Sequence, residues 1–245
     1  MILKLVWKLA IVLAVCGVAS VEAAPRLARA VVTGMTGPAD YQAQGQDWKS
    51  LYRGVALTEG ASARTSTNSV ADFSLTADAR LRITPKTIIR LDQLREETQG
   101  LPERGKKPAA LTNIELERGK ILVQTGPQSD KSSFTVTTRS CLTEVRGFGA
   151  YSVWLLNNRA CCRVMDRTVT LLIRGRADPV VLQAGQQLCV ECDPRTNQAI
   201  DTNVKPTPII EPDPDWNPPL TPPPGPPTGP EIPPVYEISP VLPKK

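Results

Sequence analysis

The sequence predicts an all-β domain, and three observations support that prediction. Apolar residues alternate with polar ones in short runs from about Ala30 to Cys192, as in "ADFSL" and "ARLRI". Turn-forming residues interrupt these runs roughly every ten positions, and no stretch has the apolar spacing of an amphipathic helix. Alternation with a period of two between frequent turns is typical of many short strands that each bury one face.

The expected strands follow one another along a β domain that spans residues 30–195. One stretch between them, "EETQGLPERGKKPAALTN", lacks the alternation and is expected to form an exposed loop. The positions expected to face the core are Ala71, Phe73, Leu75, Leu81, Ile83, Ile89, Leu91, Ile114, Leu116, Ile121, Val123, Phe134, Val136, Val169, Leu171, Ile173, Val180 and Leu182.

The N-terminal residues 1–23 have the composition of a secretory signal. Lys4 and Lys8 precede the apolar run "LAIVLAVCGVA", and the small-residue ending "VEA" predicts cleavage after Ala23. The run is shorter than the ~20 residues that a spanning helix needs, so no stable membrane span is expected. We therefore expect the mature protein in the periplasm or outside the cell, with lipidation at Cys16 as an alternative.

The C-terminal residues 203–245 are expected to form a disordered, proline-rich tail. From Lys205 onward 16 residues are proline, and proline at this density removes backbone donors and leaves few apolar groups for a core. The tail is interpreted as a spacer or as a recognition segment. In the second case Trp216 and Tyr236 are the candidate contacts.

The composition argues against several classes of function. The chain contains no histidine, which excludes Ser-His-Asp and Cys-His catalysis and imidazole metal ligands. Its net charge of +5 is small and scattered, and aromatic residues make up only 4%, so nucleic-acid binding is not expected. No motif indicates an enzyme, and no cofactor is expected.

The segment "LYRGVALTEGASARTSTNSVADFSLTADARLRITPKTIIRL" resembles the FecR domain, a periplasmic β domain. "IELERGKILVQT", "FTVTTRSCLTEVRGFGAYSV" and "VVLQAGQQ" resemble later parts of the same domain, so the similarity runs from about Thr33 to Val190. Phe148 stands where the family has threonine, and Asp166-Arg167 replaces an acidic-glycine turn. The residues that match the first part of the family pattern are Gly60, Thr65, Asn68, Ser69, Leu75, Leu81, Pro85 and Thr87.

The resemblance implies short strands coiled in a β-solenoid-like or sandwich-like stack. Regulators of this family carry a cytoplasmic sigma-factor-binding part before a spanning helix and the β domain. Here the apolar run begins at the start of the sequence, so we expect a free-standing module without direct sigma-factor binding. The expected function is non-enzymatic binding or scaffolding in envelope signalling, with an envelope protein as partner.

A kink is expected at Arg146, Gly147 and Gly149 within the "VRGFG" stretch. Glycine inside a strand pattern marks a bulge or a close approach of two backbones. The neighbouring arginine could pin that bend on a carboxylate or a carbonyl, or it could hold an anionic ligand. We interpret the kink as architectural.

Five cysteines remain after the signal: Cys141, Cys161, Cys162, Cys189 and Cys192. In an oxidising compartment they are candidates for structural disulfides, with one thiol left over. The "CVEC" spacing, together with the vicinal pair, allows a second hypothesis of a cysteine-based metal-binding or redox-sensing envelope protein.

Strand geometry adds one expectation about the vicinal pair. A turn at Asn157-Asn158 would place Trp154 opposite Cys161 and Val153 opposite Cys162. One of the two cysteines then faces the core, and its expected partner is either Cys141 or a cysteine of "CVEC".

Overall fold

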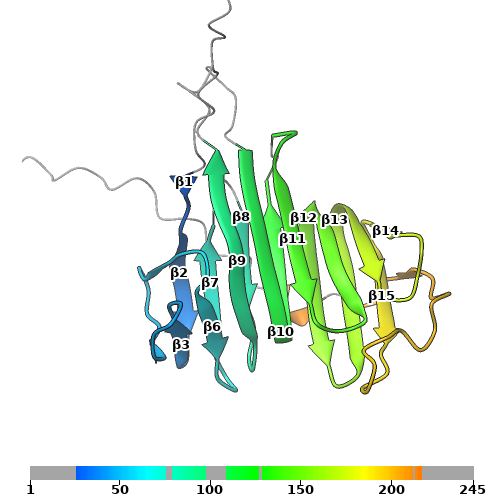
Figure 1. The fold of residues 1–245 in the computed structure, drawn as a ribbon, viewed down its shortest axis with the longest axis horizontal. Coiled ribbons are helices and arrows are strands. Elements are labelled where there is room, and N and C mark those ends of the chain that lie inside the picture. Colours follow the sequence, from blue (N-terminus) through cyan, green and yellow to red (C-terminus); the bar gives the residue numbers. More distant parts are fainter. Residues whose placement is uncertain (1–25, 76–78, 98–108, 127–128, 212, 217–245) are drawn as a thin grey trace, which may run out of the picture.

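The computed structural model describes residues 26–75, 79–97, 109–126, 129–211 and 213–216. Within these residues every element is a β-strand except the short 3-10 helix η2 (Pro214–Trp216), which confirms the all-β prediction (Figure 1). No described helix is long and apolar enough to cross a membrane. The strands are β1 (Arg26–Leu27), β2 (Ala30–Thr36), β3 (Ala39–Gln42), β4 (Lys49–Ser50), β5 (Ala56–Leu57), β6 (Ser62–Thr65), β7 (Val70–Ser74), β8 (Ala79–Ile83), β9 (Ile88–Glu97), β10 (Ala109–Thr125), β11 (Ser133–Thr138), β12 (Leu142–Leu156), β13 (Arg159–Ile173), β14 (Val180–Gln183), β15 (Gln186–Glu191) and β16 (Thr207–Pro208).

One hydrogen-bonded network joins these strands and folds into two layers. The first layer runs from β4 through β3, β6, β9, the first part of β10, β11, the first part of β12 and the second part of β13 to β14, with β1 beside β9. The second layer runs from β5 through β2, β7, β8 and the remaining parts of β10, β12 and β13 to β15 and β16.

Three long strands belong to both layers. β10 pairs with β9 up to Arg118 and with β12 from Gly119 onward. β12 leaves β11 after Arg146 and joins β10 at Ala150, and β13 changes its partner from β15 to β14 after Val164. The chain therefore coils from one layer over to the other, as the solenoid-like expectation requires.

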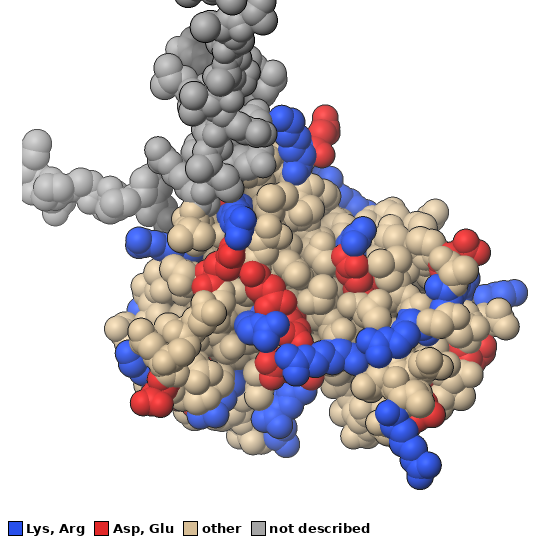
Figure 2. Space-filling model, in the orientation of Figure 1, with Lys and Arg blue, Asp and Glu red and all other residues tan. Residues whose placement is uncertain are grey.

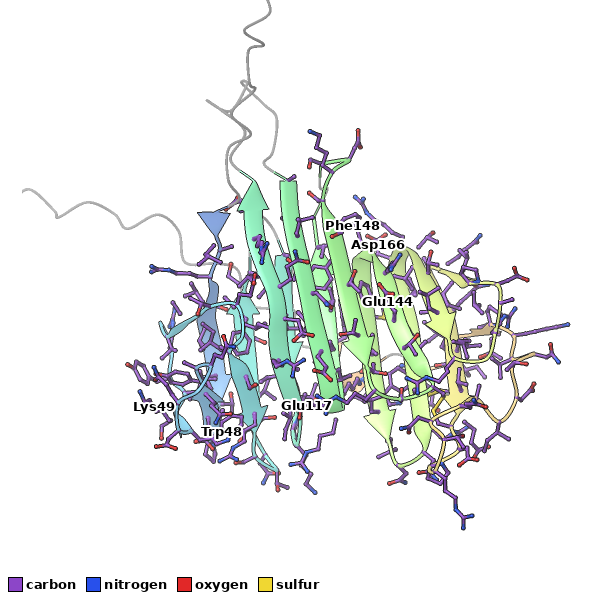
Figure 3. All side chains as sticks on the ribbon, viewed as in Figure 1. Trp48, Lys49, Glu117, Glu144, Phe148 and Asp166 are labelled. Atoms are coloured by element: carbon purple, nitrogen blue, oxygen red, sulfur yellow. A yellow bond between two sulfur atoms is a disulfide. The ribbon has the colours of Figure 1, made fainter. Side chains whose placement is uncertain are left out.

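The bends of these strands lie at residues with positive φ. They include Gly119 (φ 89°), Gly149 (φ 115°) and Arg167 (φ 66°). Phe148 and Asp166, beside the bends of β12 and β13, lie toward one end of the sandwich, and Glu117 lies at the other end (Figure 3). A Cβ atom added to Gly149 would lie 2.4 Å from the carbonyl oxygen of Asp166, so the two backbones touch here. The kink is therefore a fold-over between layers.

The core fills the space between the layers, and the alternation located it correctly. Every position that the sequence marked as core-facing is buried, from Ala71 to Leu182. Fully burying one such aliphatic side chain contributes about 1.5–3 kcal/mol relative to exposing it. Side chains between the layers thus provide the main force that holds the coil together.

The expected loop from Glu96 to Asn113 is wrong at both of its ends. Glu96 and Glu97 complete β9 and pair with Ala110 and Ala109, which begin β10. Both alanines are buried, but the polar residues around them hide this part of the hairpin from a pattern analysis. The middle of the stretch lies outside the described residues, as does the expected signal segment 1–23.

Two described elements, β16 and η2, lie within the first part of the expected tail, which begins at residue 203. β16 pairs with β15, and η2 lies against the second layer. The remainder of the expected tail, residues 217–245, lies outside the described residues.

Replacing Gly149 with alanine should destabilise the protein by about 2–5 kcal/mol, because the substitution adds backbone strain to a clash with Asp166. Gly185→Ala is the matched control, since its φ is 82° but no atom lies within 4 Å of the added Cβ. It should cost only about 1–2 kcal/mol. Urea unfolding of the oxidised proteins measures both, and equal losses would contradict a close backbone approach at the kink.

Candidate functional site

A row of outward-facing side chains crosses the second layer from β7 to β15. Residues that lie directly opposite each other on neighbouring strands share one face of the sheet, so the register defines this row. We call it the transverse row. Its members, in spatial order, are Asp72, Arg82, Leu122, Ser152, Arg163 and Gln187.

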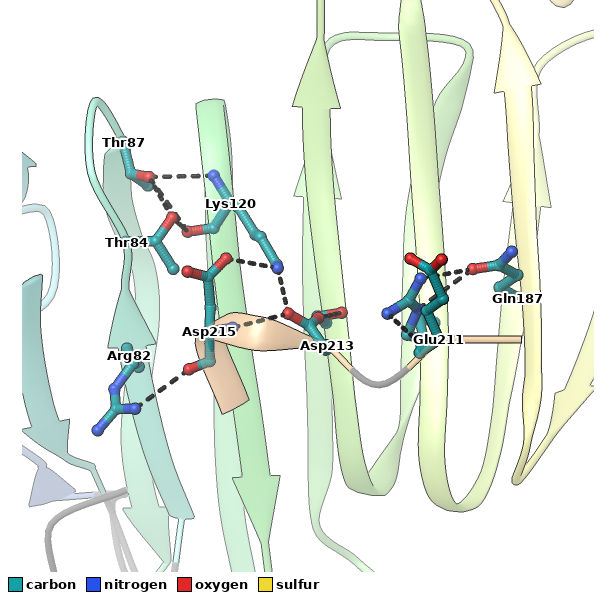
Figure 4. A network of polar contacts seen from close by, with 10 residues as sticks. Arg82, Thr84, Thr87, Lys120, Gln187, Glu211, Asp213 and Asp215 are labelled. Atoms are coloured by element: carbon teal, nitrogen blue, oxygen red, sulfur yellow. Dashed lines mark hydrogen bonds and ion pairs between the residues drawn. The ribbon is translucent and has the colours of Figure 1, made fainter. Parts of the chain in front are cut away.

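Residues 207–211 and 213–216, which we call the strap, lie across this row (Figure 4). The strap begins with the β16–β15 pairing, and the N–H of Ile209 donates to the carbonyl of Gly185 (2.8 Å). Arg163 Nη1 then donates to the carbonyl of Glu211 (3.2 Å). Arg82 Nη1 donates to the carbonyl of Asp215 (3.2 Å), so the strap reaches from β15 to β8.

Asp213 is the strap residue that is most firmly held. Its side chain is almost fully buried, and Lys120 Nζ donates to Oδ1 at 2.5 Å while Ser152 Oγ donates to Oδ2 at 3.0 Å. The same ammonium group donates to Asp215 Oδ2 at 2.6 Å, and the N–H of Asp215 donates to Asp213 Oδ1 at 3.1 Å. One lysine therefore binds two carboxylates that are separated by a single residue.

The sheet holds these donors in place through contacts of its own. Asp72 accepts two hydrogen bonds from Arg82, Nε to Oδ1 at 2.7 Å and Nη2 to Oδ2 at 3.0 Å. The N–H of Lys120 donates to Thr87 Oγ1 (3.0 Å), and the carbonyl of Lys120 accepts from the hydroxyls of Thr84 and Thr87. Contacts within the sheet and its turns therefore position Arg82 and Lys120, two of the residues that bind the strap.

The aromatic ring of Trp154 lies beside this site. The Lys120 ammonium and the Arg163 guanidinium both lie 5.8 Å from the centre of its ring. Cations over an aromatic face are attracted by the negative charge density of the ring. The ring therefore helps to hold in place two cations that contact the strap.

The pKa of Asp213 is lowered below its ordinary value. Burial alone would raise it, but the hydrogen bond and positive charge of Lys120, with the hydrogen bonds from Ser152 and Asp215, outweigh that effect. The carboxylate therefore stays charged across the neutral range.

The structure joins four of the five cysteines in two disulfides, Cys141–Cys192 and Cys161–Cys189. Cys161 and Cys189 lie directly opposite each other on β13 and β15, with their Cα atoms 4.1 Å apart. The "CVEC" cysteines are thus divided between two bridges and do not pair with each other. Among the described residues no group of three Cys, Asp or Glu side chains could hold a metal ion.

The expected turn at Asn157-Asn158 gave the register correctly but the wrong cysteine partner. Trp154 is opposite Cys161 and Val153 is opposite Cys162, as expected. The core-facing residue is Cys162, however, and it is a free thiol. On β15 its opposite residue is Leu188, whereas Cys189 lies opposite Cys161 and pairs with it.

Cys162 and Tyr151 are buried titratable groups with a structural role. Burial raises the pKa of the Cys162 thiol, and burial with the nearby Cys162 raises that of the Tyr151 phenol. Both groups are therefore neutral and lack the thiolate or phenolate form that chemistry would need.

The remaining predicted site residues do not come together. Arg146 is exposed on the first layer and donates to Glu144 on its own strand, with Nη2 to Oε2 at 2.9 Å. Gly147 and Gly149 form the fold-over. Trp216 ends η2, and its N–H donates to the carbonyl of Asp213 (3.1 Å), while Tyr236 lies outside the described residues.

The outer face of the first layer carries mixed, paired charges. Buried Glu115 contacts Arg90 Nη2 at 2.6 Å and Arg139 Nε at 2.5 Å, and Arg95 Nη2 lies 2.9 Å from Glu59 Oε1. Basic and acidic side chains lie beside one another over the face in view (Figure 2). This face fits the small, scattered net charge of the sequence.

Sequence reasoning missed the residues that form the strap contacts. Lys120, Ser152 and Arg82 look like ordinary solvent-facing strand positions, and Asp213 and Asp215 fall within the proline-rich tail. The one local signal was "PDPDW", an acidic interruption of that tail.

The chain was compared with family models, curated proteins and solved structures. The family model described as FecR protein matches residues 61–177, which confirms the resemblance to the FecR domain. Two crystal structures of a candidate anti-sigma factor from Parabacteroides distasonis ATCC 8503 are similar at 13% and 14% identity, with TM-scores of 0.41 and 0.40. Each similarity covers 60% of this chain and 57% of the solved chain. No curated protein matches the chain.

The strap should stay docked from pH 7 to below pH 5, because the pKa of Asp213 is depressed. A depressed carboxyl pKa stabilises the folded state above the unfolded value near 3.8, and the contribution disappears as the pH falls through the folded value. NMR titration of the Asp213 carboxyl carbon and of the Ile209 amide measures this directly. An Asp213 midpoint above 4, or release of the strap near pH 6, would refute the Lys120 contact as its anchor.

Proposed function

We propose, from the match of residues 61–177 to the family model described as FecR protein, that this chain is a non-enzymatic binding or scaffolding module of the bacterial envelope. The proposed setting is the periplasm, and the proposed role is to hold an envelope protein in a signalling assembly. In this proposal the surface of the β domain binds the partner, and the protein catalyses no reaction.

The observation that carries the proposal is the docked strap. The second layer holds an extended segment by side chains that the sheet itself positions, which is what a peptide-binding surface does. Recognition of extended segments through main-chain and carboxylate contacts is a recurring way in which β domains bind partners.

The compartment is supported by the cysteines. Two disulfides are typical of proteins that fold in an oxidising environment, and the periplasm is one. Each bridge also closes a long loop, which stabilises a small envelope domain by about 2–4 kcal/mol.

Crosslinking in intact cells of the source bacterium tests the proposal. The tagged full chain is compared with a chain that ends at Trp216, which retains every described residue. Because the β domain carries the binding surface, both chains should capture the same envelope protein, as read by mass spectrometry.

The control is an unrelated exported protein that carries residues 217–245 at its C-terminus. Capture of the same partner by this control, together with its loss from the shortened chain, would place recognition in the tail and reject the β domain as the binding module. Capture of nothing beyond the tag-only background would reject a partner-binding function altogether.

A further inference from the structure

We propose that the strap fills a docking site that also accepts an extended acidic segment of a partner protein. The segment that fits carries two carboxylates separated by one residue. This inference rests on the proposed function, since it names the surface and the partner chemistry that the binding module would use.

The contacts of the strap define what the site recognises. Lys120 Nζ lies 2.5 Å from Asp213 Oδ1 and 2.6 Å from Asp215 Oδ2, so a single ammonium group binds both carboxylates. The Ser152 hydroxyl donates to the second carboxylate oxygen of Asp213, and Arg82 donates to the main-chain carbonyl of Asp215. Charge-assisted hydrogen bonds of this kind are stronger than neutral ones and demand a fixed geometry.

Apart from Asp213, the strap buries little of itself. Ile210 is 88% exposed, and Thr207, Pro208, Glu211 and Pro214 are also exposed. A segment with few buried apolar contacts opens at low cost compared with the core of its domain. The strap can therefore leave the site while the two layers stay folded.

The site persists when the strap leaves. Arg82 remains bound to Asp72, and Lys120 remains fixed through the N–H and carbonyl contacts with Thr84 and Thr87. The ammonium and the Ser152 hydroxyl then face an open surface beside the ring of Trp154. A second acidic segment restores the lost hydrogen bonds, and this gives the exchange its driving force.

Because the strap belongs to the same chain as the site, it competes strongly with any free segment for that site. A tethered segment has a high effective concentration, so a free segment of equal intrinsic affinity binds much more weakly. The strap thus keeps the site closed until a partner with a better segment, or a high local concentration of it, is present. The apparent affinity of the site equals its intrinsic affinity multiplied by the fraction of molecules in which the site is open.

Fluorescence anisotropy with a labelled peptide of sequence "KPTPIIEPDPDWN" tests the proposal on the full, oxidised chain. Asp213→Asn combined with Asp215→Asn removes the carboxylates of the strap and leaves the site intact. We expect this variant to bind the peptide about tenfold or more tightly than the wild type, since its own strap no longer competes.

Two matched controls accompany this measurement. A peptide with both aspartates changed to asparagine should not bind, because Lys120 then has no carboxylate to bind. Adding Lys120→Met to the double variant should abolish binding of the acidic peptide, while thermal unfolding and two intact disulfides show that the fold is kept.

Several outcomes would overturn the proposal. They are the absence of peptide binding to the double variant, equal binding of the asparagine peptide, and equal affinity of the wild type and the double variant. A wild-type dimer in light scattering that Lys120→Met dissolves would identify the occupant as a second copy instead. If crosslinking still captures a partner while the peptide fails, only this inference falls and the binding module stands.

Discussion

The structure depends on three strands that are long enough to belong to both layers. β10, β12 and β13 each cross from one layer to the other at residues with positive φ, and the contact between Gly149 and the Asp166 carbonyl fixes one crossing. Because a shift by one residue would turn every side chain to the opposite face, these crossings decide what the second layer presents outward. They place Lys120 opposite Trp154 and therefore build the strap site.

The strap shows how a polar contact can specify the position of a segment without a large core. Asp213 is buried, and burial of a carboxylate is costly unless it is paired and hydrogen-bonded. Lys120 and Ser152 supply both requirements, so docking is favourable in one register and unfavourable in its neighbours. The same logic makes the site selective, since a segment without a carboxylate would leave the ammonium unpaired.

The fold could be predicted from the sequence because its signals are local. Alternation from Ala71 to Leu182 reports which face of each strand is buried, and the Asn157-Asn158 turn sets the pairing of the strands beside it. The partner of each cysteine could not be predicted, since Cys161 and Cys189 lie on β13 and β15, which β14 separates along the chain. The strap was missed for the same reason. Lys120 and Asp213 are 93 residues apart, and proline-rich composition says nothing about a distant cation.

The most direct test of this account is hydrogen exchange of residues 207–216, followed by mass spectrometry in the wild type and in Lys120→Met. Arg146→Ala is the matched control, because it removes a cation from the first layer that has no contact with the strap. The account predicts fast exchange of the strap in Lys120→Met alone, with β10 and β12 protected in all three proteins. Equal protection of the strap in the wild type and Lys120→Met would contradict the claim that this lysine holds the segment on the sheet.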